Sequence, residues 1–425
     1  MQKKTKICLL NDSFPPLIDG VANTVMNYAR ILNNSETSEC IVGTPAYPDA
    51  SYDMYPYRVI PYQSFDTTAL FGYRTGNPLE ASAVKEMTAF QPDIIHTHCP
   101  AMSTLMARIL RGSTGAPVVF TYHTKFDEDI AKRFPSKLLQ KESIRAMIDN
   151  IEACDEVWAV SKGAGENLRS LGYEGDIRIV QNGVDLTKGK ATDEEVRKET
   201  KGCDLPEHVP VCLFVGRLMN YKGLPYIMEA LRYLNTNNID FRMVFVGDGD
   251  DRMYLERTAE EYGIDKKVFF TGAIRDRKAL RAWYTRADLF LFPSTYDTNG
   301  IVVREAAACG LASVLIRDSC AAEGITDARN GFLTEQSGGA IAVLLTRLFS
   351  DLEYVHQTGQ NAMDEIYISW EDSVHQAFEY YQEILEKKAN GTMPKHRHNH
   401  SERVLTQAAE LSKNAESIRM RWQGM

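Results

Sequence analysis

Short apolar runs alternate with longer amphipathic segments along most of this chain, and this alternation limits the fold more than any other feature. Each apolar run ends in a polar or glycine-containing turn, as strands buried in a parallel sheet do. The first series of runs comprises residues 6–10, 40–45, 93–98, 117–124, 156–161 and 177–183, and the second comprises residues 211–216, 241–250, 267–272, 289–294 and 312–316. Strands that alternate with helix-like segments predict an α/β fold with parallel sheets.

A strongly polar stretch at residues 187–208 separates the two series and is typical of a linker or an exposed insertion. We therefore expect one α/β domain in residues 1–185 and a second in residues 186–365. A long helical pattern follows at residues 366–388. The remainder, residues 389–425, is predicted to be a hinge and an extra C-terminal helix with an apolar stripe, through which an oligomer could form.

Composition excludes several classes of protein. The formal net charge of −9 argues against a general nucleic-acid-binding protein, which would need a basic face. The eight cysteines are scattered without the spacing of a zinc site, so we expect free thiols in a reducing cytosol. The N-terminus lacks the apolar run of a signal peptide, and no apolar stretch approaches the ~20 residues that span a bilayer. We expect a cytoplasmic protein whose membrane contact would be peripheral, on the inner face of the cell membrane.

Residues that follow the strands are the first candidates for a site, because ligands of open parallel sheets bind beyond the carboxyl ends of the strands. Arg217 and Lys222 follow the strand at 211–216, directly before a helix expected to begin at Gly223. Two cations beside a helix N-terminus form a site suited to a diphosphate. On spacing alone, a surface arginine and lysine in a polar loop is an equal alternative.

Two carboxylates follow the strand at 289–294. Asp297 lies in the loop, where it could also serve only to stabilise the N-terminus of the next helix. Glu305 lies within that helix among apolar neighbours. A buried carboxylate needs partners, and the hydroxyl groups of a ribose would be suitable ones.

The first domain offers histidines and a glycine. His98 and His123 end their strands, and a satisfied core histidine is the alternative for His123. Two histidines, His96 and His98, without a nearby carboxylate make a poor metal site. Gly20 opens a helix after a proline-containing loop, where backbone amides can approach a phosphate, although a simple turn is the alternative.

Two further motifs predict less. The segment at 246–251, VGDGDD, is an incomplete dinucleotide fingerprint, because Arg252 stands at the third glycine. The segment at 396–400, HRHNH, is more typical of a solvated tail than of a metal site.

Taken together, these segments resemble the family-4 retaining glycosyltransferases of the GT-B fold, over about residues 1–388. The resemblance implies two Rossmann-like domains that face a central cleft, with the helix at 366–388 crossing back onto the first domain. In that family the residues matching Arg217 and Lys222 bind the donor diphosphate. The residue matching Glu305 binds the ribose, and the one matching Asp297 contacts the sugar.

The resemblance implies the remaining site residues as well. The loop of Gly20 closes over the donor phosphate, and His123 lies beside the donor sugar. The residues expected to be catalytic are His123, Asp297, Glu305, Arg217 and Lys222. The residues expected to bind the donor are Gly20, Arg217, Lys222, Gly247, Gly272, Asp297, Asn299, Gly300, Ile301 and Glu305. On the acceptor side we expect His98, Lys125 and Phe126.

This chain departs from the family pattern in the donor loop. Asp297 stands where the family usually has glutamate, and Asn299 stands where phenylalanine or glutamine is common. These two positions therefore bear on the choice of donor sugar. The implied mechanism is retaining, by front-face attack without a covalent enzyme intermediate, and the leaving diphosphate is stabilised by cations and helix N-termini. We expect no cofactor and no metal ion.

Residues 125–148 interleave basic and apolar side chains. They predict either an ordinary amphipathic surface helix or an interfacial helix that meets anionic lipid. The segment YHTKFD at 122–127 also resembles a loop of bacterial glycosyltransferases that glucosylate diacylglycerol. The first hypothesis is therefore hexose transfer from a UDP-glucose-like donor to a lipid. The alternatives are a soluble sugar or polysaccharide acceptor, GDP-mannose as the donor, a noncatalytic nucleotide-sugar-binding scaffold, or a phosphorylase, for which no pyridoxal lysine is recognisable.

Overall fold

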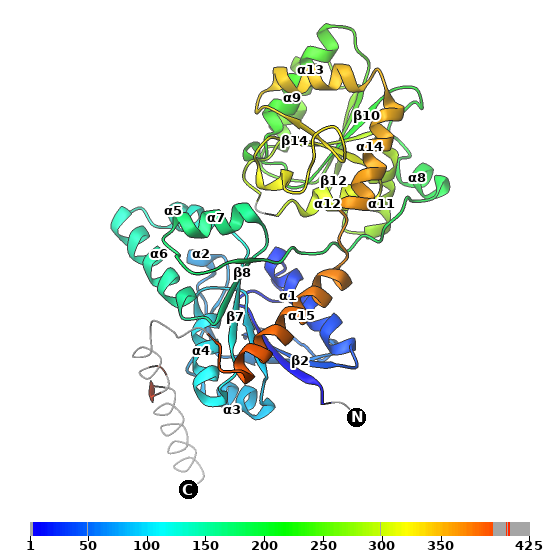
Figure 1. Cartoon of the computed structure of the whole chain (residues 1–425). Coiled ribbons are helices and arrows are strands. Elements are labelled where there is room, and N and C mark those ends of the chain that lie inside the picture. Colours follow the sequence, from blue (N-terminus) through cyan, green and yellow to red (C-terminus); the bar gives the residue numbers. More distant parts are fainter. Residues whose placement is uncertain (1–2, 49, 298, 394–404, 406, 409–425) are drawn as a thin grey trace. The chain divides into compact units, whose positions relative to one another are not determined.

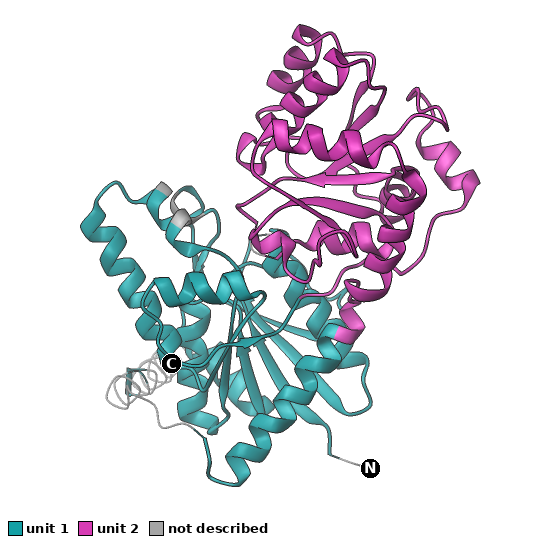
Figure 2. Ribbon diagram, turned by 45° about the horizontal axis from the view of Figure 1, so that its top comes forward, with its two compact units in different colours: residues 1–181, 373–425 teal, residues 182–372 magenta. Residues whose placement is uncertain are grey.

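The computed structural model describes residues 3–48, 50–297, 299–393, 405 and 407–408. The chain divides into two compact units (Figure 2). Unit 1 comprises Met1–Gln181 with Ser373–Met425, and unit 2 comprises Asn182–Asp372. The divisions thus lie at 181/182 and 372/373, where the sequence placed boundaries at 185/186 and 365/366.

Unit 1 is built on a parallel seven-stranded sheet with the order β3-β2-β1-β6-β7-β8-β9. Its strands are β1 (Thr5–Leu10), β2 (Ser38–Pro45), β3 (Arg58–Tyr62), β6 (Ile94–Thr97), β7 (Val118–Tyr122), β8 (Glu156–Ala159) and β9 (Arg178–Ile179). Its first helices are α1 (Gly20–Asn34), α2 (Thr68–Phe71), α3 (Ala81–Phe90), α4 (Met102–Thr114), α5 (Phe126–Arg133), α6 (Lys137–Glu152) and α7 (Lys162–Ser170). A small antiparallel pair, β4 (Ser64–Phe65) and β5 (Thr75–Gly76), lies outside the main sheet.

The last described helix of the chain, α15 (Trp370–Ala389), returns to unit 1 (Figure 1). Its fully buried side chains, Val374, Ala377, Tyr381 and Ile384, recur at the three- and four-residue spacing of one helical face. The Tyr381 ring stacks on Trp158 of β8, with ring centroids 5.4 Å apart. The expectation that this helix crosses back onto the first domain is therefore confirmed.

Unit 2 carries a parallel six-stranded sheet with the order β12-β11-β10-β13-β14-β15. Its strands are β10 (Val211–Val215), β11 (Arg242–Val246), β12 (Val268–Gly272), β13 (Leu289–Phe292), β14 (Ala312–Ile316) and β15 (Phe332–Thr334). Its helices are α8 (Asp193–Glu199), α9 (Leu224–Thr236), α10 (Arg252–Glu261), α11 (Arg277–Arg286), α12 (Ile301–Ala308), α13 (Gly338–Leu348) and α14 (Leu352–Glu365), with short 3-10 turns η1 (Asn220–Lys222) and η2 (Cys320–Ala322). The strand order reverses between β10 and β13, and this switch point is where such sheets bind ligands.

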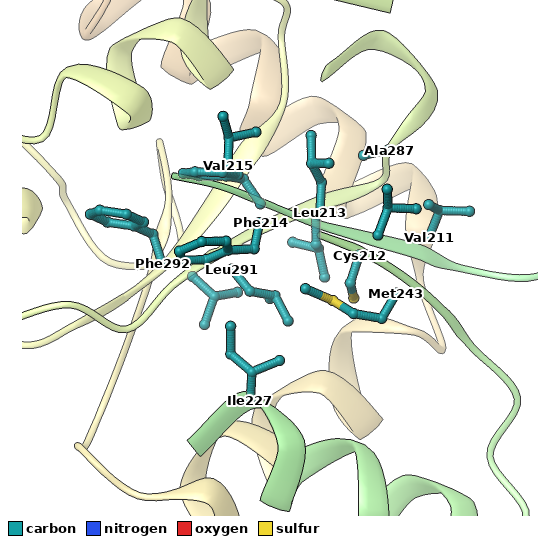
Figure 3. Close-up of a cluster of buried hydrophobic side chains, with 14 of the residues drawn as sticks. Val211, Cys212, Leu213, Phe214, Val215, Ile227, Met243, Ala287, Leu291 and Phe292 are labelled. Carbon is teal, nitrogen blue, oxygen red and sulfur yellow. The ribbon is translucent and has the colours of Figure 1, made fainter. Parts of the chain in front are cut away.

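The core of unit 2 surrounds β10, all five residues of which are buried (Figure 3). Phe214 stacks on Phe292 of β13 with ring centroids 5.9 Å apart, and Ile227 of α9 faces the same cluster. Burial of consecutive residues on both faces of a strand is what a parallel sheet covered by helices requires. Two α/β units of this kind, each built on a parallel sheet, confirm the expected fold class. Among the residues that the structure describes, no helix combines the length and apolar character needed to cross a bilayer.

Glycines allow the loops at the carboxyl ends of β10, β11 and β12 to touch. Gly247 has a φ of +144°, and a Cβ atom there would lie 1.9 Å from the carbonyl oxygen of Gly216. The amide of Gly247 also donates to the carbonyl oxygen of Gly272 over 2.9 Å. These backbones can approach only because no side chain separates them.

We expect the substitution Gly247→Ala to destabilise unit 2 by more than about 2 kcal/mol, because both the positive φ and the contact with Gly216 exclude a Cβ atom. The thermal midpoint of unfolding, followed by circular dichroism, should fall by several degrees. The matched control is Gly339→Ala in α13, where a Cβ atom would meet nothing within 4 Å. That variant should unfold at the same temperature or slightly higher. Equal midpoints for the two variants would contradict the prediction.

Candidate functional site

Lys222 and Asp297 meet in unit 2, beyond the carboxyl ends of β10 and β13. The Lys222 Nζ atom lies 2.6 Å from Oδ1 of Asp297, and the hydroxyl of Ser294 donates to Oδ2 over 2.5 Å. The Lys222 side chain is only 11% exposed and that of Asp297 is 24% exposed. The ammonium also lies over the Phe292 ring, 5.6 Å from its centroid. A largely buried ion pair therefore occupies the switch point of this sheet.

The backbone around Gly223 brings this pair together. Gly223 follows the turn η1, has a φ of +80° and directly precedes α9, which has Pro225 in its first turn. A Cβ atom at Gly223 would lie 2.3 Å from the carbonyl oxygen of Pro293. Only glycine permits this approach. The loop after β10 consequently lies against the end of β13.

Arg217, the other expected diphosphate ligand, has an exposed side chain. Within the described part of the chain it forms no ion pair. A guanidinium in this state is open to an anionic ligand. Its expected role beside Lys222 stays a prediction.

Glu305 is buried in α12 and has two protein partners that the sequence did not reveal. Its Oε1 accepts from Nη1 of Arg277 over 3.1 Å, and its Oε2 accepts from the hydroxyl of Tyr284 over 3.0 Å. Burial raises the pKa of Glu305, and the charge of Arg277 opposes that rise. Arg277 also pairs with Asp185 over 3.0 Å. The need of a buried carboxylate for partners is thus met within unit 2, and ribose binding by Glu305 stays a prediction.

The donor loop continues from Asp297 into α12. Gly300 has a φ of +55° and caps the helix, and Ile301 is its first residue. Asn299 is buried, and both its backbone oxygen and its Oδ1 accept from Arg304 of the same helix. The expected donor contacts of Asn299, Gly300 and Ile301 stay predictions.

Buried histidines cluster in unit 1 at the carboxyl ends of β6 and β7. Nδ1 of His98 lies 2.9 Å from Nε2 of His123, and the His96 ring lies 4.1 Å from the His98 ring. His96 contacts the hydroxyl of Tyr381 over 2.5 Å and that of Thr121 over 2.7 Å. Burial lowers the pKa of His123 to about 3 and the pKa values of His96 and His98 well below their usual range. The three imidazoles are therefore neutral at neutral pH.

Beside Gly20, the expected phosphate-binding residue of unit 1, a carboxylate caps the following helix. Asp19 caps α1, and its Oδ1 accepts from the amides of Val21 and Ala22 over 2.9 and 2.7 Å. A carboxylate therefore already satisfies amides beside Gly20, which is exposed and whose added Cβ atom would meet nothing within 4 Å. Phosphate binding by Gly20 stays a prediction.

On the acceptor side, Phe126 packs edge-on against Tyr122 at 5.5 Å and joins the rim of the core. Lys125 directly precedes α5. Both expected acceptor contacts stay predictions.

The histidine-rich segment at 396–400 lies outside the described residues. Most of the expected C-terminal helix does so too; Leu405, which is described, packs against the core of unit 1. In the described part of the chain, no three His, Cys, Asp or Glu side chains gather as a metal site would need.

Sequence comparison identifies relatives for both units. The profile of the family described as Glycosyltransferase Family 4 matches residues 18–188, and that of Glycosyl transferases group 1 matches residues 192–365. An uncharacterized glycosyltransferase of Methanocaldococcus jannaschii is 26% identical over 397 residues, which cover 90% of this chain and 99% of that protein. The alpha-monoglucosyldiacylglycerol synthase of Acholeplasma laidlawii is 23% identical over 338 residues, which cover 77% of this chain and 84% of the synthase.

Comparison with solved structures identifies the same fold. The Anabaena protein HepE in complex with UDP superposes with a TM-score of 0.72 at 18% identity, covering 89% of this chain and all of HepE. At this level of identity the likeness concerns the fold. The two Rossmann-like units are those of GT-B glycosyltransferases.

We expect acid to destabilise unit 1 through the buried histidines. Below a pH of about 6.5 these histidines bind protons in the unfolded chain but stay neutral in the folded protein. The free energy of unfolding therefore decreases as the pH falls toward their lowered pKa values. Each histidine should contribute about 1.4 kcal/mol per pH unit in this range. Burial raises the pKa of Asp12 to about 6, so the folded state binds a proton there more readily than the unfolded chain does. This single group gains stability as the pH falls and only partly offsets the loss from three histidines. The thermal midpoint should therefore fall between pH 7.5 and 5.5.

The control for this prediction is His123→Asn, which removes one of the three groups. Its midpoint should fall less over the same pH interval than that of the unchanged protein. An unchanged pH dependence would show that His123 takes up a proton as readily in the folded state as in the unfolded state.

Proposed function

Since the chain belongs to the family-4 glycosyltransferases, we propose that it is a retaining hexosyltransferase that moves a hexose from a nucleotide-diphosphate sugar, UDP-glucose in the first instance, to a lipid such as diacylglycerol. The observation that carries the proposal is the buried contact of Lys222 with Asp297 at the switch point of unit 2. A cation held there can exchange its carboxylate partner for the oxygens of a diphosphate, while Asp297 becomes able to accept from a sugar hydroxyl.

The proposed reaction breaks the bond between C1 of the hexose and the diphosphate oxygen and the O–H bond of the acceptor. A new C1–O bond and a new O–H bond replace them. The oxygen of the acceptor hydroxyl bonds to C1 of the hexose on the face that the diphosphate leaves, so the anomeric configuration is retained. The hydroxyl proton passes to the departing phosphate oxygen. Lys222 and Arg217 stabilise the negative charge that develops on the diphosphate, and these two cations are proposed to serve in place of a divalent metal ion.

His123 is proposed to orient the transferred sugar. Because burial lowers its pKa to about 3, the ring is neutral when the enzyme works near neutral pH. A neutral imidazole can hold a hydroxyl group by a hydrogen bond but supplies no full positive charge. The role of His123 is therefore one of positioning more than of charge stabilisation.

A groove along α6 supports the lipid acceptor. The groove has a volume of about 610 Å³, and its lining includes Lys137, Lys141, Arg145 and the apolar Ile144, together with the acids Asp149 and Glu152. Next to this groove on the same helix, Leu138 and Leu139 are 68% and 52% exposed. Exposed leucines among cations suit the surface of an anionic membrane. The relative from Acholeplasma laidlawii, named for the synthesis of a glucosyldiacylglycerol, favours the same class of acceptor.

The proposal is tested by a transfer assay in excess EDTA. UDP-glucose, UDP-galactose, UDP-N-acetylglucosamine and GDP-mannose are each offered with diacylglycerol in anionic vesicles, and separately with soluble sugars. We expect a glucolipid with an α-anomeric linkage from UDP-glucose, detected by mass spectrometry and NMR. Transfer only to soluble sugars would replace the lipid acceptor, and absence of transfer from every donor would favour a noncatalytic scaffold.

The matched variants in this assay are Lys222→Met and Lys266→Met. Methionine keeps the length of the buried Lys222 stem but removes the ammonium, so kcat/KM should fall by roughly 100-fold or more. Lys266 is exposed in the same unit and its replacement should leave kcat/KM unchanged. Circular dichroism verifies that both variants are folded. Full turnover by the Lys222 variant would disprove the diphosphate assignment.

We expect the double substitution of Leu138 and Leu139 by glutamine to weaken binding to anionic vesicles by about 10-fold or more, because two apolar side chains no longer enter the interface. Cosedimentation with vesicles that contain phosphatidylglycerol measures the effect. The control replaces Met253 and Val343, which are equally exposed on unit 2, by glutamine. Similar vesicle binding by both double variants would place the membrane contact elsewhere.

A further inference from the structure

The side-chain amide of Asn299 has a fixed orientation, because a buried arginine lies on one side of it. Nη1 of Arg304 donates to the backbone oxygen of Asn299 over 2.5 Å and to its Oδ1 over 2.8 Å. A guanidinium group carries N–H donors and no acceptor, so the amide atom that faces it must be the oxygen. The NH2 group of Asn299 therefore points away from Arg304.

Arg304 is well placed to hold this orientation. It lies in α12, one helical turn after Gly300, and is only 5% exposed. Burial lowers the pKa of Arg304 to about 10, and the neighbouring Glu323 favours the charged form, so the guanidinium stays charged at neutral pH. A charged donor on a helix offers the loop a fixed partner.

The NH2 group that results has no partner of its own. Nδ2 of Asn299 and Oγ of Ser319 are both buried and form no hydrogen bond with any described residue. Each of the two residues is 8% exposed. Their segments also adjoin, since a Cβ atom at Gly300 would lie 3.1 Å from Cα of Ala321. Buried polar groups are normally paired, so two unpaired ones on adjoining segments suit a ligand that brings oxygen atoms.

We propose that Arg304 is a positioning residue for donor-sugar selection: it fixes Asn299 so that Nδ2 donates a hydrogen bond to an oxygen of the transferred sugar, with Ser319 as a second contact. This inference rests on the proposed function and deepens it. Epimeric hexoses differ only in the direction of one hydroxyl group. A hydrogen-bond donor with a fixed direction can therefore bind one epimer more tightly than the other, whereas the proposed contact of Lys222 with the diphosphate cannot distinguish them.

The test is the isosteric substitution Asn299→Asp. The carboxylate still accepts from Arg304, but an oxygen replaces the NH2 donor. Titration calorimetry measures the affinities of UDP-glucose, UDP-galactose and UDP alone. We expect the affinity ratio of the two epimers to change by roughly 10-fold or more, while UDP binds within about twofold of the unchanged protein. An unchanged epimer ratio, or an equal loss of affinity for UDP, would overturn the inference.

Three further variants complete the experiment. Arg304→Lys keeps a charged donor and should keep part of the discrimination, whereas Arg304→Met should lose it. The control Asn238→Asp makes the same chemical change at an exposed position of unit 2 and should leave the epimer ratio unaltered. Equal epimer ratios for the lysine and methionine variants would also overturn the inference.

Calorimetry separates this inference from the proposed function. If the unchanged protein binds the two epimers with different affinities but transfers neither, the transferase proposal fails and the selectivity test still stands. If it binds no UDP-sugar, both proposals fail.

Discussion

The close contact of Gly223 with the Pro293 carbonyl determines the geometry of the candidate donor site. Because no Cβ atom separates the two backbones, the loop after β10 lies against the end of β13, and Lys222 reaches Asp297 from a position 75 residues earlier in the chain. The contact of Gly247 with Gly216 acts in the same way on the other side of β10. In unit 2, glycines thus allow the loops that follow the strands to touch, and the charged side chains of Lys222 and Asp297 lie beyond the carboxyl ends of β10 and β13.

The sequence predicted most strands of the two main sheets and missed β3 and β15, each of which lies at a sheet edge. Strands such as β10 and β13 are uninterrupted apolar runs because helices cover both sides of the sheet. The edge strand β3 was not predicted: it contains Pro61 and alternates in burial, and proline is tolerated only at such an edge. The helix α8 also went unnoticed, although Thr192 and Glu195 form a capping box that the spacing contains.

The sequence was sufficient to predict where the candidate site lies, at the ends of particular strands, but not which of its side chains contact one another. Parallel strands bring their carboxyl ends to one edge, so Lys222 and Asp297 could be assigned to the same region from the order of the motifs alone. Which groups pair is decided by side-chain packing between distant segments. The partners of Glu305, Arg277 and Tyr284, come from the helix before β13 and carry no signal in the sequence.

The return of α15 to unit 1 has a consequence for the order of folding during synthesis. Unit 2 is continuous from residue 182 to 372, so the ribosome delivers all of it before the helix that unit 1 still lacks. Until Tyr381 arrives, Trp158 lacks its stacking partner and the imidazole of His96 lacks a hydroxyl that it contacts. During synthesis, the core of unit 1 is therefore incomplete and partly exposed to water or to chaperones until α15 is made, while unit 2 can already be folded.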